Sequence, residues 1–487
     1  MADLARHYEQ MTRAYPEDTL CIVFDIDGTI LDMRYMVVHC LIGFDRVHGT
    51  EYFRGLTAED VDVHENRIED FLKARGLPSN ARENILRWYL QHLWEPRSVL
   101  AGCRPYRGVL GVIRWFQLQS RTIVALNTGR PEALRDITLQ SLNQVGQAYR
   151  VAFESSALCM NPNGWNVRVQ DAKIEALRDL QDRGYRVVAV VDNEPANLAA
   201  MAEADETHEV MFFHADTIFE SQRDALPRHV GGGDYALSAL IREEDLSQRV
   251  LFVWHGINDE ANLRQFLTSR VTRAECDVRL DPLGRLVLRH DSFEQTPWSR
   301  AEHPFLLEDC LGILKERGRA VALDLKEEGL LDRCLQALVR AGFAESEVSF
   351  TGTIDVLNEP AVHQIRSIMP GADITVPAGF LAPLILSGTA LIDAVLAELA
   401  RWGINGLSLA WSTPGIRRVL DELDERGWRV DIFGVDDLET FLEAALLLPR
   451  AVVADFNFPD WHYYGRGSGE RHAFHRYRLA EETAIGR

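Results

Sequence analysis

The feature that most constrains this chain is an apolar run that ends on two aspartates and a glycine. Leu20 to Phe24 has the length of a short buried strand and is typical of a parallel sheet covered on both faces. Asp25 and Asp27 follow at alternate positions, so both side chains leave the same face of the chain. Gly28 then permits a tight turn. Carboxylates at this end of a strand lie where open α/β sheets bind ligands, and they suit a hard cation such as Mg²⁺.

Charge and cysteine content narrow the classes of partner and compartment. The 487 residues include 52 Lys and Arg against 73 Asp and Glu, a net charge of −21, without a basic cluster. We therefore expect neither nucleic acid nor an anionic membrane as a binding partner, and an acidic surface would slightly repel anionic substrates. Seven scattered cysteines without a CxxC pair argue against a disulfide framework or structural zinc. The first residues lack the apolar core of a signal peptide, which predicts a cytoplasmic protein. The sequence leaves the oligomeric state undetermined.

Three further segments in the first half place polar residues beside predicted strands. The strand 121–126 is followed by Thr128, where a hydroxyl before a helix N-terminus can bind a phosphate oxygen. The strand 185–191 ends in Asp192. Lys173 lies in the first turn of the helix that precedes this strand. These segments predict a doubly wound parallel sheet with its polar residues at one edge.

The Asp-x-Asp-Gly-Thr stretch and the three later segments resemble the motifs of haloacid dehalogenase (HAD) superfamily phosphatases over about residues 18–222. The resemblance implies that Asp25 is the nucleophile and that Asp27 is the general acid and base. It implies that Thr128 and Gly129 bind the phosphate and that Lys173 neutralises charge in catalysis.

The same resemblance implies a Mg²⁺ site formed by Asp25, Asp27 and Asp192. The fourth motif departs from the commoner pattern, because no second aspartate follows Asp192. The second group of that motif is either Glu194 or Asn197.

Residues 33–104, directly after the first motif, have helical periodicity and no obvious strand pattern. In position and size they resemble the helical cap that covers the site of HAD phosphatases. The expected phosphatase domain is 1–235. Residues 222–234, which include Gly231, Gly232 and Gly233, are interpreted as a linker.

From residue 250 the pattern restarts as repeated strand-helix units, which predicts a (β/α)₈ TIM-barrel domain over 236–460. The tail 461–487 has no clear core pattern. Polar residues fall at or near the carboxyl ends of the predicted barrel strands, where such barrels place their chemistry. They are His255, Glu275, Asp277, His290, Asp324 and Lys326.

These residues resemble the motifs of glycerophosphodiester phosphodiesterases, a group of phospholipase-C-like barrels. The resemblance implies His255 and His290 as acid/base pair and Lys326 as the group that stabilises phosphate charge. It also implies a divalent cation, Mg²⁺ or Ca²⁺, held by Glu275, Asp277 and Asp324. The sequence departs from the family at Gly256, where family members usually have arginine.

The two resemblances together predict an enzyme, a Mg²⁺-dependent bifunctional phosphoester hydrolase. Its substrates would be small phosphorylated molecules. Its first half would cleave phosphomonoesters through an aspartyl-phosphate and its second half phosphodiesters, and we expect the two halves to act in sequence. The main alternative is a phosphatase whose barrel only binds a ligand or partner. A third interpretation is a regulatory protein in which neither half turns over.

Overall fold

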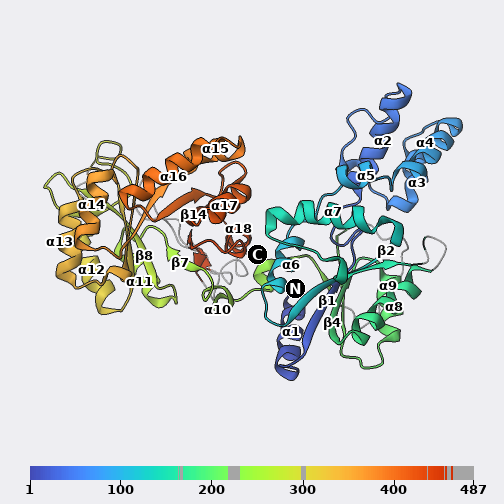
Figure 1. The fold of residues 1–487 in the computed structure, drawn as a ribbon, viewed down its shortest axis with the longest axis horizontal. Coiled ribbons are helices and arrows are strands. Elements are labelled where there is room, and N and C mark those ends of the chain that lie inside the picture. The colour runs from blue at the N-terminus through green and yellow to red at the C-terminus, as the bar shows by residue number, and fades with distance from the viewer. Residues whose placement is uncertain are drawn as a thin grey trace, which may run out of the picture. The chain divides into compact units, whose positions relative to one another are not determined.

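The chain folds into two compact units, Met1–Ile241 and Arg242–Arg487, each described here by itself (Figure 1). The structure is a computed structural model. It describes residues 1–162, 164, 168–217, 231–297, 303–435, 437–454, 456–457 and 462–463. No described helix is long and apolar enough to cross a membrane.

The first unit is built on a six-stranded parallel sheet in the order β3-β2-β1-β4-β5-β6. Its strands are β1 (Thr19–Phe24), β2 (Thr122–Pro131), β3 (Leu158–Asn161), β4 (Tyr185–Asp192), β5 (Met211–Ala215) and β6 (Gly231–Gly233). Strand β1, the apolar run of the sequence, is buried and pairs with β2 on one side and β4 on the other. The carboxyl ends of three central strands therefore meet at one place, and the predicted doubly wound sheet is confirmed.

Helices cover both faces of this sheet (Figure 1). They are α1 (Ala2–Ala14), α6 (Val109–Gln117), α7 (Arg135–Gly146), α8 (Val169–Asp182) and α9 (Pro195–Ala204). Helices α8 and α9 bury Leu180 and Leu198 against Val23 of β1 in one apolar cluster. Helices α1 and α6 meet through an edge-to-face contact of Tyr8 with Phe116. Burial on both faces explains why the strand sequences are continuously apolar rather than alternating.

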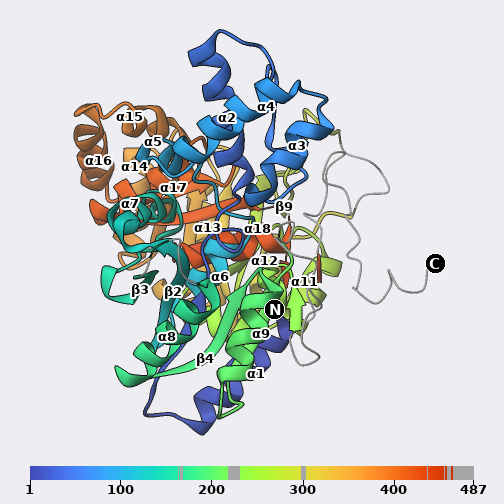
Figure 2. The same ribbon diagram turned by 90° about the vertical axis from the view of Figure 1, so that its right-hand side faces the viewer.

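The predicted helical cap is also confirmed. Residues 33–104 contain α2 (Arg34–His48), α3 (Ile68–Ala74), α4 (Ser79–His92) and α5 (Pro96–Ala101), with two 3₁₀ turns, η1 (Ala58–Asp60) and η2 (Glu65–Arg67), and no strand. These helices form a group in Figure 1, and α2, α3 and α4 also stand together in Figure 2; the group has its own apolar core.

The interpretation of Gly231–Gly233 as linker is wrong. These residues form β6, which pairs in parallel with β5 through Phe213, His214 and Ala215. Backbone hydrogen bonds alone hold such a strand, so apolar patterning could not reveal it. Residues 222–230 of the expected linker lie outside the described residues.

The second unit is a closed barrel of eight parallel strands, as predicted. They are β7 (Leu251–Trp254), β8 (Arg273–Leu280), β10 (Ala320–Leu325), β11 (Val348–Gly352), β12 (Asp373–Pro377), β13 (Gly406–Ala410), β14 (Arg429–Val435) and β15 (Ala451–Ala454). Pairing of β15 with β7 and of β8 with β10 closes the ring.

Strand β9 (Leu286–Leu288) pairs antiparallel with β8 and lies outside the ring of parallel strands. The barrel helices are α10 (Glu243–Leu246), α11 (Glu260–Thr268), α12 (Leu307–Glu316), α13 (Leu331–Ala341), α14 (Glu359–Ile368), α15 (Ala382–Leu386), α16 (Leu391–Trp402), α17 (Ile416–Glu425) and α18 (Leu438–Leu446). Of the predicted tail, only β17 (His462–Tyr463) is described, paired with β16 (Phe456–Asn457).

Candidate active sites

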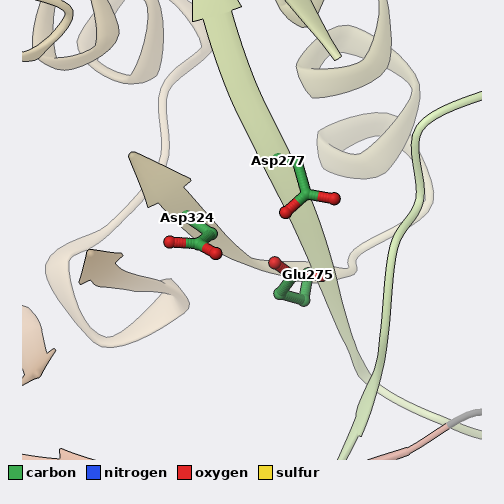
Figure 3. Close-up of side chains that lie close together, drawn as sticks. All are labelled: Glu275, Asp277 and Asp324. Carbon is green, nitrogen blue, oxygen red and sulfur yellow. The ribbon is translucent and has the colours of Figure 1, made fainter. Parts of the chain in front are cut away.

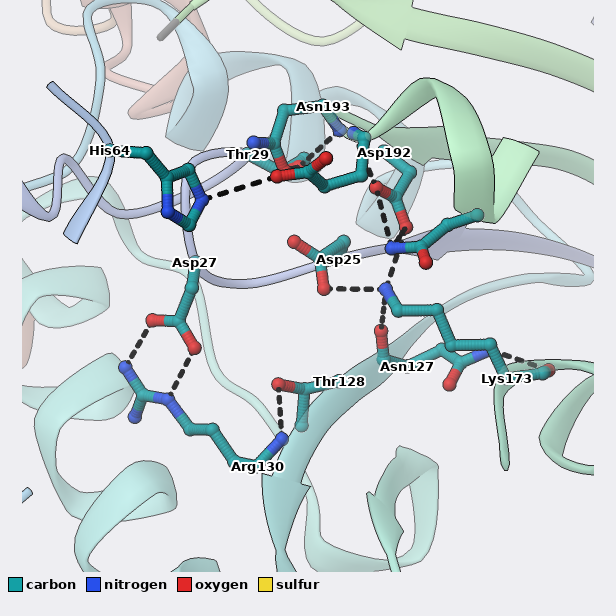
Figure 4. A network of polar contacts seen from close by, with 12 residues as sticks. Asp25, Asp27, Thr29, His64, Asn127, Thr128, Arg130, Lys173, Asp192 and Asn193 are labelled. Atoms are coloured by element: carbon teal, nitrogen blue, oxygen red, sulfur yellow. Dashed lines mark hydrogen bonds and ion pairs between the residues drawn. The ribbon is translucent and has the colours of Figure 1, made fainter. Parts of the chain in front are cut away.

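The first candidate site lies where β1, β2 and β4 end (Figure 4). Asp25, the residue after β1, is 6% exposed, and its backbone N–H donates to the carbonyl of Val191 in β4. Gly28 has φ of 82°, a conformation that suits glycine and turns the chain away from the strand. The local sequence thus fixes Asp25 at the sheet edge and sends the following residues toward the cap.

Lys173 of α8 links two carboxylates at this edge (Figure 4). Its Nζ lies 2.6 Å from Oδ1 of Asp25 and 2.6 Å from Oδ2 of Asp192, and it donates to the carbonyl of Asn127 at 3.0 Å. Burial raises the pKa of Asp25 to about 7, although the Lys173 ammonium acts in the opposite direction. A buried carboxylate with a perturbed pKa beside a fixed ammonium is typical of catalytic sites.

Asp27 is held by an arginine that the sequence analysis did not single out. Nε and Nη2 of Arg130 donate to the two Asp27 oxygens at 2.8 and 2.6 Å, and Arg130 is 1% exposed. Nη1 of Arg130 donates to Thr138 of α7 at 3.0 Å. The Thr128 hydroxyl accepts the Arg130 backbone N–H at 3.2 Å. Arg130 lies two residues beyond Thr128 in the same strand, and this proximity was the one signal that could have identified it.

A cavity of about 450 Å³ opens onto these side chains. Its walls combine predicted site residues with groups from the cap. They include Asp25, Asp27, Thr128, Gly129, Lys173, Glu194 and Asn197 from the sheet unit, and His64, Glu65, Asn66, Leu90 and Trp94 from the cap. The structure therefore brings the predicted first-half residues together, and it adds His64 and Glu65, for which the sequence carried no signal.

The donor set at the sheet edge suits Mg²⁺. Mg²⁺ in enzymes is usually held by one or two carboxylates together with waters and substrate phosphate oxygens. Asp25, Asp27 and Asp192 offer such carboxylates, and both oxygens of Asp27 also accept hydrogen bonds from Arg130. Asn197 donates to both oxygens of Asp192 at 3.4 and 3.3 Å, and Glu194 lies 3.1 Å from Nε2 of His64.

The second candidate site is a cluster of three carboxylates on two neighbouring barrel strands (Figure 3). Glu275 and Asp277 lie on the same face of β8, and Asp277 is the register partner of Asp324 in β10. One ligand oxygen from each residue lies within 4.8 Å of the others. Among the described residues this is the one group of three acidic, histidine or cysteine side chains so arranged. Its all-oxygen chemistry fits Mg²⁺ or Ca²⁺.

The charges around this cluster shift the pKa values of its two buried members, Glu275 and Asp277, in opposite directions. Burial and the charge of Asp277 raise the pKa of Glu275 to about 8. Burial alone would also raise the pKa of Asp277, but Lys326, His255 and then His290 outweigh it and lower this pKa to about 2.

Lys326 neutralises part of the cluster. Nζ of Lys326 lies 2.7 Å from Oδ1 of Asp277 and also contacts Asp324. Oδ1 of Asp277 is buried, so a cation that binds it must compete with this ammonium.

The two predicted histidines lie beside the carboxylates. His255 follows β7, and its Nε2 is 3.9 Å from Oε2 of Glu275. His290 follows β9, and its Nδ1 lies 2.8 Å from a carboxylate oxygen of Asp291. Gly256 has φ of 69° and its N–H donates to Glu275 at 2.7 Å, so the glycine that departs from the family pattern serves this backbone turn.

Known proteins resemble this chain only distantly. No protein-family model and no curated protein sequence matches it. Among solved structures, a glycerophosphodiester phosphodiesterase from Parabacteroides distasonis is 16% identical with a TM-score of 0.33, over 42% of this chain and 92% of its own.

A similar enzyme from Agrobacterium tumefaciens is 15% identical with a TM-score of 0.30, over 42% of this chain and 95% of its own. A protein assigned provisionally as a beta-phosphoglucomutase, from Bacteroides vulgatus, is 15% identical with a TM-score of 0.25, over 44% and 83%. Likeness at this level carries no information on activity, so function is argued below from the side chains. What the geometry itself establishes is an α/β chain with a capped parallel-sheet unit and a closed parallel barrel.

Proposed function

We propose that the first unit is a Mg²⁺-dependent phosphomonoesterase with Asp25 as nucleophile. The observation that carries this proposal is the placement of Asp25. Its carboxylate is buried at a strand end, lies 2.6 Å from the ammonium of Lys173, and lines a cavity shared with Thr128. An attacking carboxylate next to a fixed positive charge and a hydroxyl suits phosphoryl transfer.

In the proposed reaction, an oxygen of Asp25 bonds to phosphorus while the bond from phosphorus to the leaving alcohol oxygen breaks. Asp27 gives a proton to that oxygen. Asp27 then takes a proton from water, whose oxygen attacks the aspartyl-phosphate and releases inorganic phosphate and the Asp25 carboxylate. Bound Mg²⁺ would neutralise phosphate charge. Each Asp27 oxygen accepts one hydrogen bond from Arg130 and keeps a second lone pair, which can carry the proton that is given in the first step and taken up in the second.

We infer for the barrel a divalent-cation-dependent phosphodiesterase activity on small phosphodiesters. Support comes from the cluster of Glu275, Asp277 and Asp324, which offers oxygen ligands beside His255 and His290. One histidine would remove a proton from water and the other would protonate the leaving alcohol. A bound cation would supply charge stabilisation for the phosphate.

One observation favours the alternative that the barrel binds a ligand without turnover. Lys326 already contacts Asp277 and Asp324, so two of the three carboxylates have a positive partner in the absence of a cation. A cation must compete with this ammonium.

The two chemistries are complementary. A phosphodiesterase releases an alcohol and a phosphomonoester, which is the substrate class of a phosphatase. We therefore propose that the two units act in sequence on one molecule. Fusion would favour this order by raising the local concentration of the second site.

The test uses the intact chain with Mg²⁺ and two chromogenic substrates, p-nitrophenyl phosphate and bis-p-nitrophenyl phosphate. Asp25→Asn should abolish monoester hydrolysis and spare diester cleavage, because an amide cannot attack phosphorus. His255→Ala should do the reverse, with a loss of about 10²–10⁴.

If no diester is cleaved, the non-catalytic barrel replaces the phosphodiesterase. If Asp25→Asn retains monoesterase activity, the nucleophile is wrong. For the sequential reaction, phosphorus NMR on a small diester should show free phosphate with wild type and accumulated monoester with Asp25→Asn. Phosphate release by that variant would contradict the proposed order of the two reactions.

A further inference from the structure

The cap places one carboxylate, Glu65, inside the cavity of the first site. Glu65 is 9% exposed and begins the 3₁₀ turn η2. The hydroxyl of Tyr89 in α4 donates to its carbonyl at 3.0 Å, and the ring of His64 accepts the backbone N–H of Asn66 at 3.2 Å. These bonds fix the turn on both sides, so Glu65 is held against the cavity.

Oε2 of Glu65 is buried and has no hydrogen-bond donor. The nearest group is Nδ1 of His64 at 3.1 Å, which pairs with Glu65 when the ring is protonated and accepts the N–H of Asn66 when the ring is neutral. The other ring nitrogen, Nε2, lies 3.1 Å from Glu194 and is engaged there. With the neutral ring, Oε2 of Glu65 lines the cavity without a hydrogen-bond donor.

Burial of this oxygen costs free energy unless a ligand donates a hydrogen bond to it. A buried carboxylate without a donor loses its solvation, and here burial raises the pKa of Glu65 to about 7. The two strong cations of the cavity do not compensate it, because Lys173 is paired with Asp25 and Asp192, and Arg130 with Asp27. A phosphate group would be repelled by Glu65. A hydroxyl or ammonium group would donate to it.

We infer that Glu65 is a specificity-determining residue that accepts a hydrogen bond from a second donor group on the leaving alcohol. The inference rests on the proposed phosphatase and names its substrate class. This class is small phosphomonoesters whose alcohol carries another hydroxyl or an ammonium group, such as a polyol or amino-alcohol phosphate. A cavity of about 450 Å³ suits a ligand of this size, and the phosphate would occupy the end near Asp25 and Thr128.

The experiment measures binding apart from turnover. Isothermal titration calorimetry on the intact chain with Mg²⁺ compares three non-hydrolysable ligands: ethylphosphonate, 2-hydroxyethylphosphonate and 2-aminoethylphosphonate. A hydrogen bond to a charged group should make a donor-bearing ligand bind about tenfold to a hundredfold more tightly than ethylphosphonate. The hydroxyl and ammonium arms identify which donor the site takes.

Matched variants attribute the preference to Glu65. Glu65→Leu should remove it for both donors. Glu65→Gln keeps an acceptor but no charge, so it should reduce the preference for the ammonium ligand more than that for the hydroxyl ligand. Glu69→Gln, an exposed acid on the same cap paired with Lys73, is the control and should bind as wild type does. If Glu65→Leu fails to fold, the wild-type and Glu65→Gln comparisons still decide.

Equal affinity of the wild type for all three phosphonates, or no binding of any, would overturn the inference. So would a preference that survives in Glu65→Leu. Hydrolysis of the corresponding ethyl, 2-hydroxyethyl and 2-aminoethyl phosphates is measured in parallel. A binding preference without Asp25-dependent hydrolysis defeats the proposed phosphatase alone. Hydrolysis without a preference defeats the role of Glu65 alone.

Discussion

Replacing Arg130 by leucine tests whether its ion pair with Asp27 supports both the fold and the reaction. The guanidinium is 1% exposed and makes two hydrogen bonds to Asp27, whose side chain is 17% exposed. Leucine keeps part of the apolar volume that packs beside Trp94 but removes every donor. Asp27 would then stand at the cavity edge without its positive partner.

The structure sets the size of the expected effect. Breaking a buried pair typically costs about 3–5 kcal/mol, and partial exposure of Asp27 puts this pair near the lower end. A loss of about 3 kcal/mol should lower the melting temperature of a unit this size by about 6–12 °C. Because Asp27 would lose its fixed orientation for proton transfer, kcat/KM for p-nitrophenyl phosphate should fall by about 10²-fold or more.

The assay is thermal unfolding by circular dichroism with parallel kinetics, extended to a double-mutant cycle with Asp27→Asn. The double variant removes both charges and should be more stable than the sum of the single losses predicts, by about 2 kcal/mol. Arg54→Leu, which breaks an ion pair with Glu51 between two exposed side chains, is the control and should cost less than about 1 kcal/mol. The reasoning is refuted if Arg130→Leu matches this control in both melting temperature and kcat/KM.

Three further expectations concern pH, cations and the barrel. Burial raises the pKa of Glu65 from its usual 4.5 to about 7, so stability is lost as pH rises through that window. The free energy of unfolding of Glu65→Gln should therefore exceed that of wild type by up to about 3 kcal/mol at about pH 8 but not at about pH 5, and melting temperatures at the two pH values check this. Mg²⁺ or Ca²⁺ should raise the melting temperature of the barrel. Asp324→Asn should need more cation than wild type for the same shift, and the control Glu328→Gln, at an exposed position, should not. Equal titrations of wild type and Asp324→Asn would argue against the carboxylate site. Arg450→Leu leaves buried Asp431 without its 2.7 Å partner and should cost about 3 kcal/mol in thermal unfolding while the KM for diesters stays unchanged.

The sequence predicted the fold because buried parallel strands carry a local signal. Apolar runs such as Leu20–Phe24 and 185–191 indicated buried strands of a parallel sheet, and repeated strand-helix units indicated a barrel. The grouping of first-site residues followed from topology, since strand ends of a parallel sheet share an edge. Asp25, Thr128, Lys173 and Asp192 could therefore be assigned to one site before their distances were known.

What the sequence could not show depends on contacts between distant segments. Arg130 faces Asp27 across more than a hundred residues, and nothing in its local pattern distinguishes it from a solvated arginine. His64 and Glu65 lie in a 3₁₀ turn whose position depends on how the cap packs. The strand Gly231–Gly233 has no side chains to give a pattern, and its pairing with β5 is purely backbone.

Both candidate sites share one electrostatic arrangement, a lysine that links carboxylates at neighbouring strand ends. In the first site Lys173 lies between Asp25 and Asp192, which keeps two close negative charges from repelling each other. In the barrel Lys326 lies in the same way between Asp277 and Asp324.

A lysine alone does not prepare either site for a phosphate. In the first site the three carboxylates of Asp25, Asp27 and Asp192 face two cations, Lys173 and Arg130, so one negative charge is left over.

In the barrel, Glu275, Asp277 and Asp324 face Lys326, and one negative charge is left over even with Glu275 protonated. A phosphate ester brings further negative charge into each site, on a chain whose net charge is already −21. Glu275 must be ionised to hold a cation, so one divalent cation reverses the sign of the first site and brings the barrel site to neutrality. The shared arrangement therefore explains why both proposed activities should require Mg²⁺ or Ca²⁺, and why chelation should abolish both rather than one.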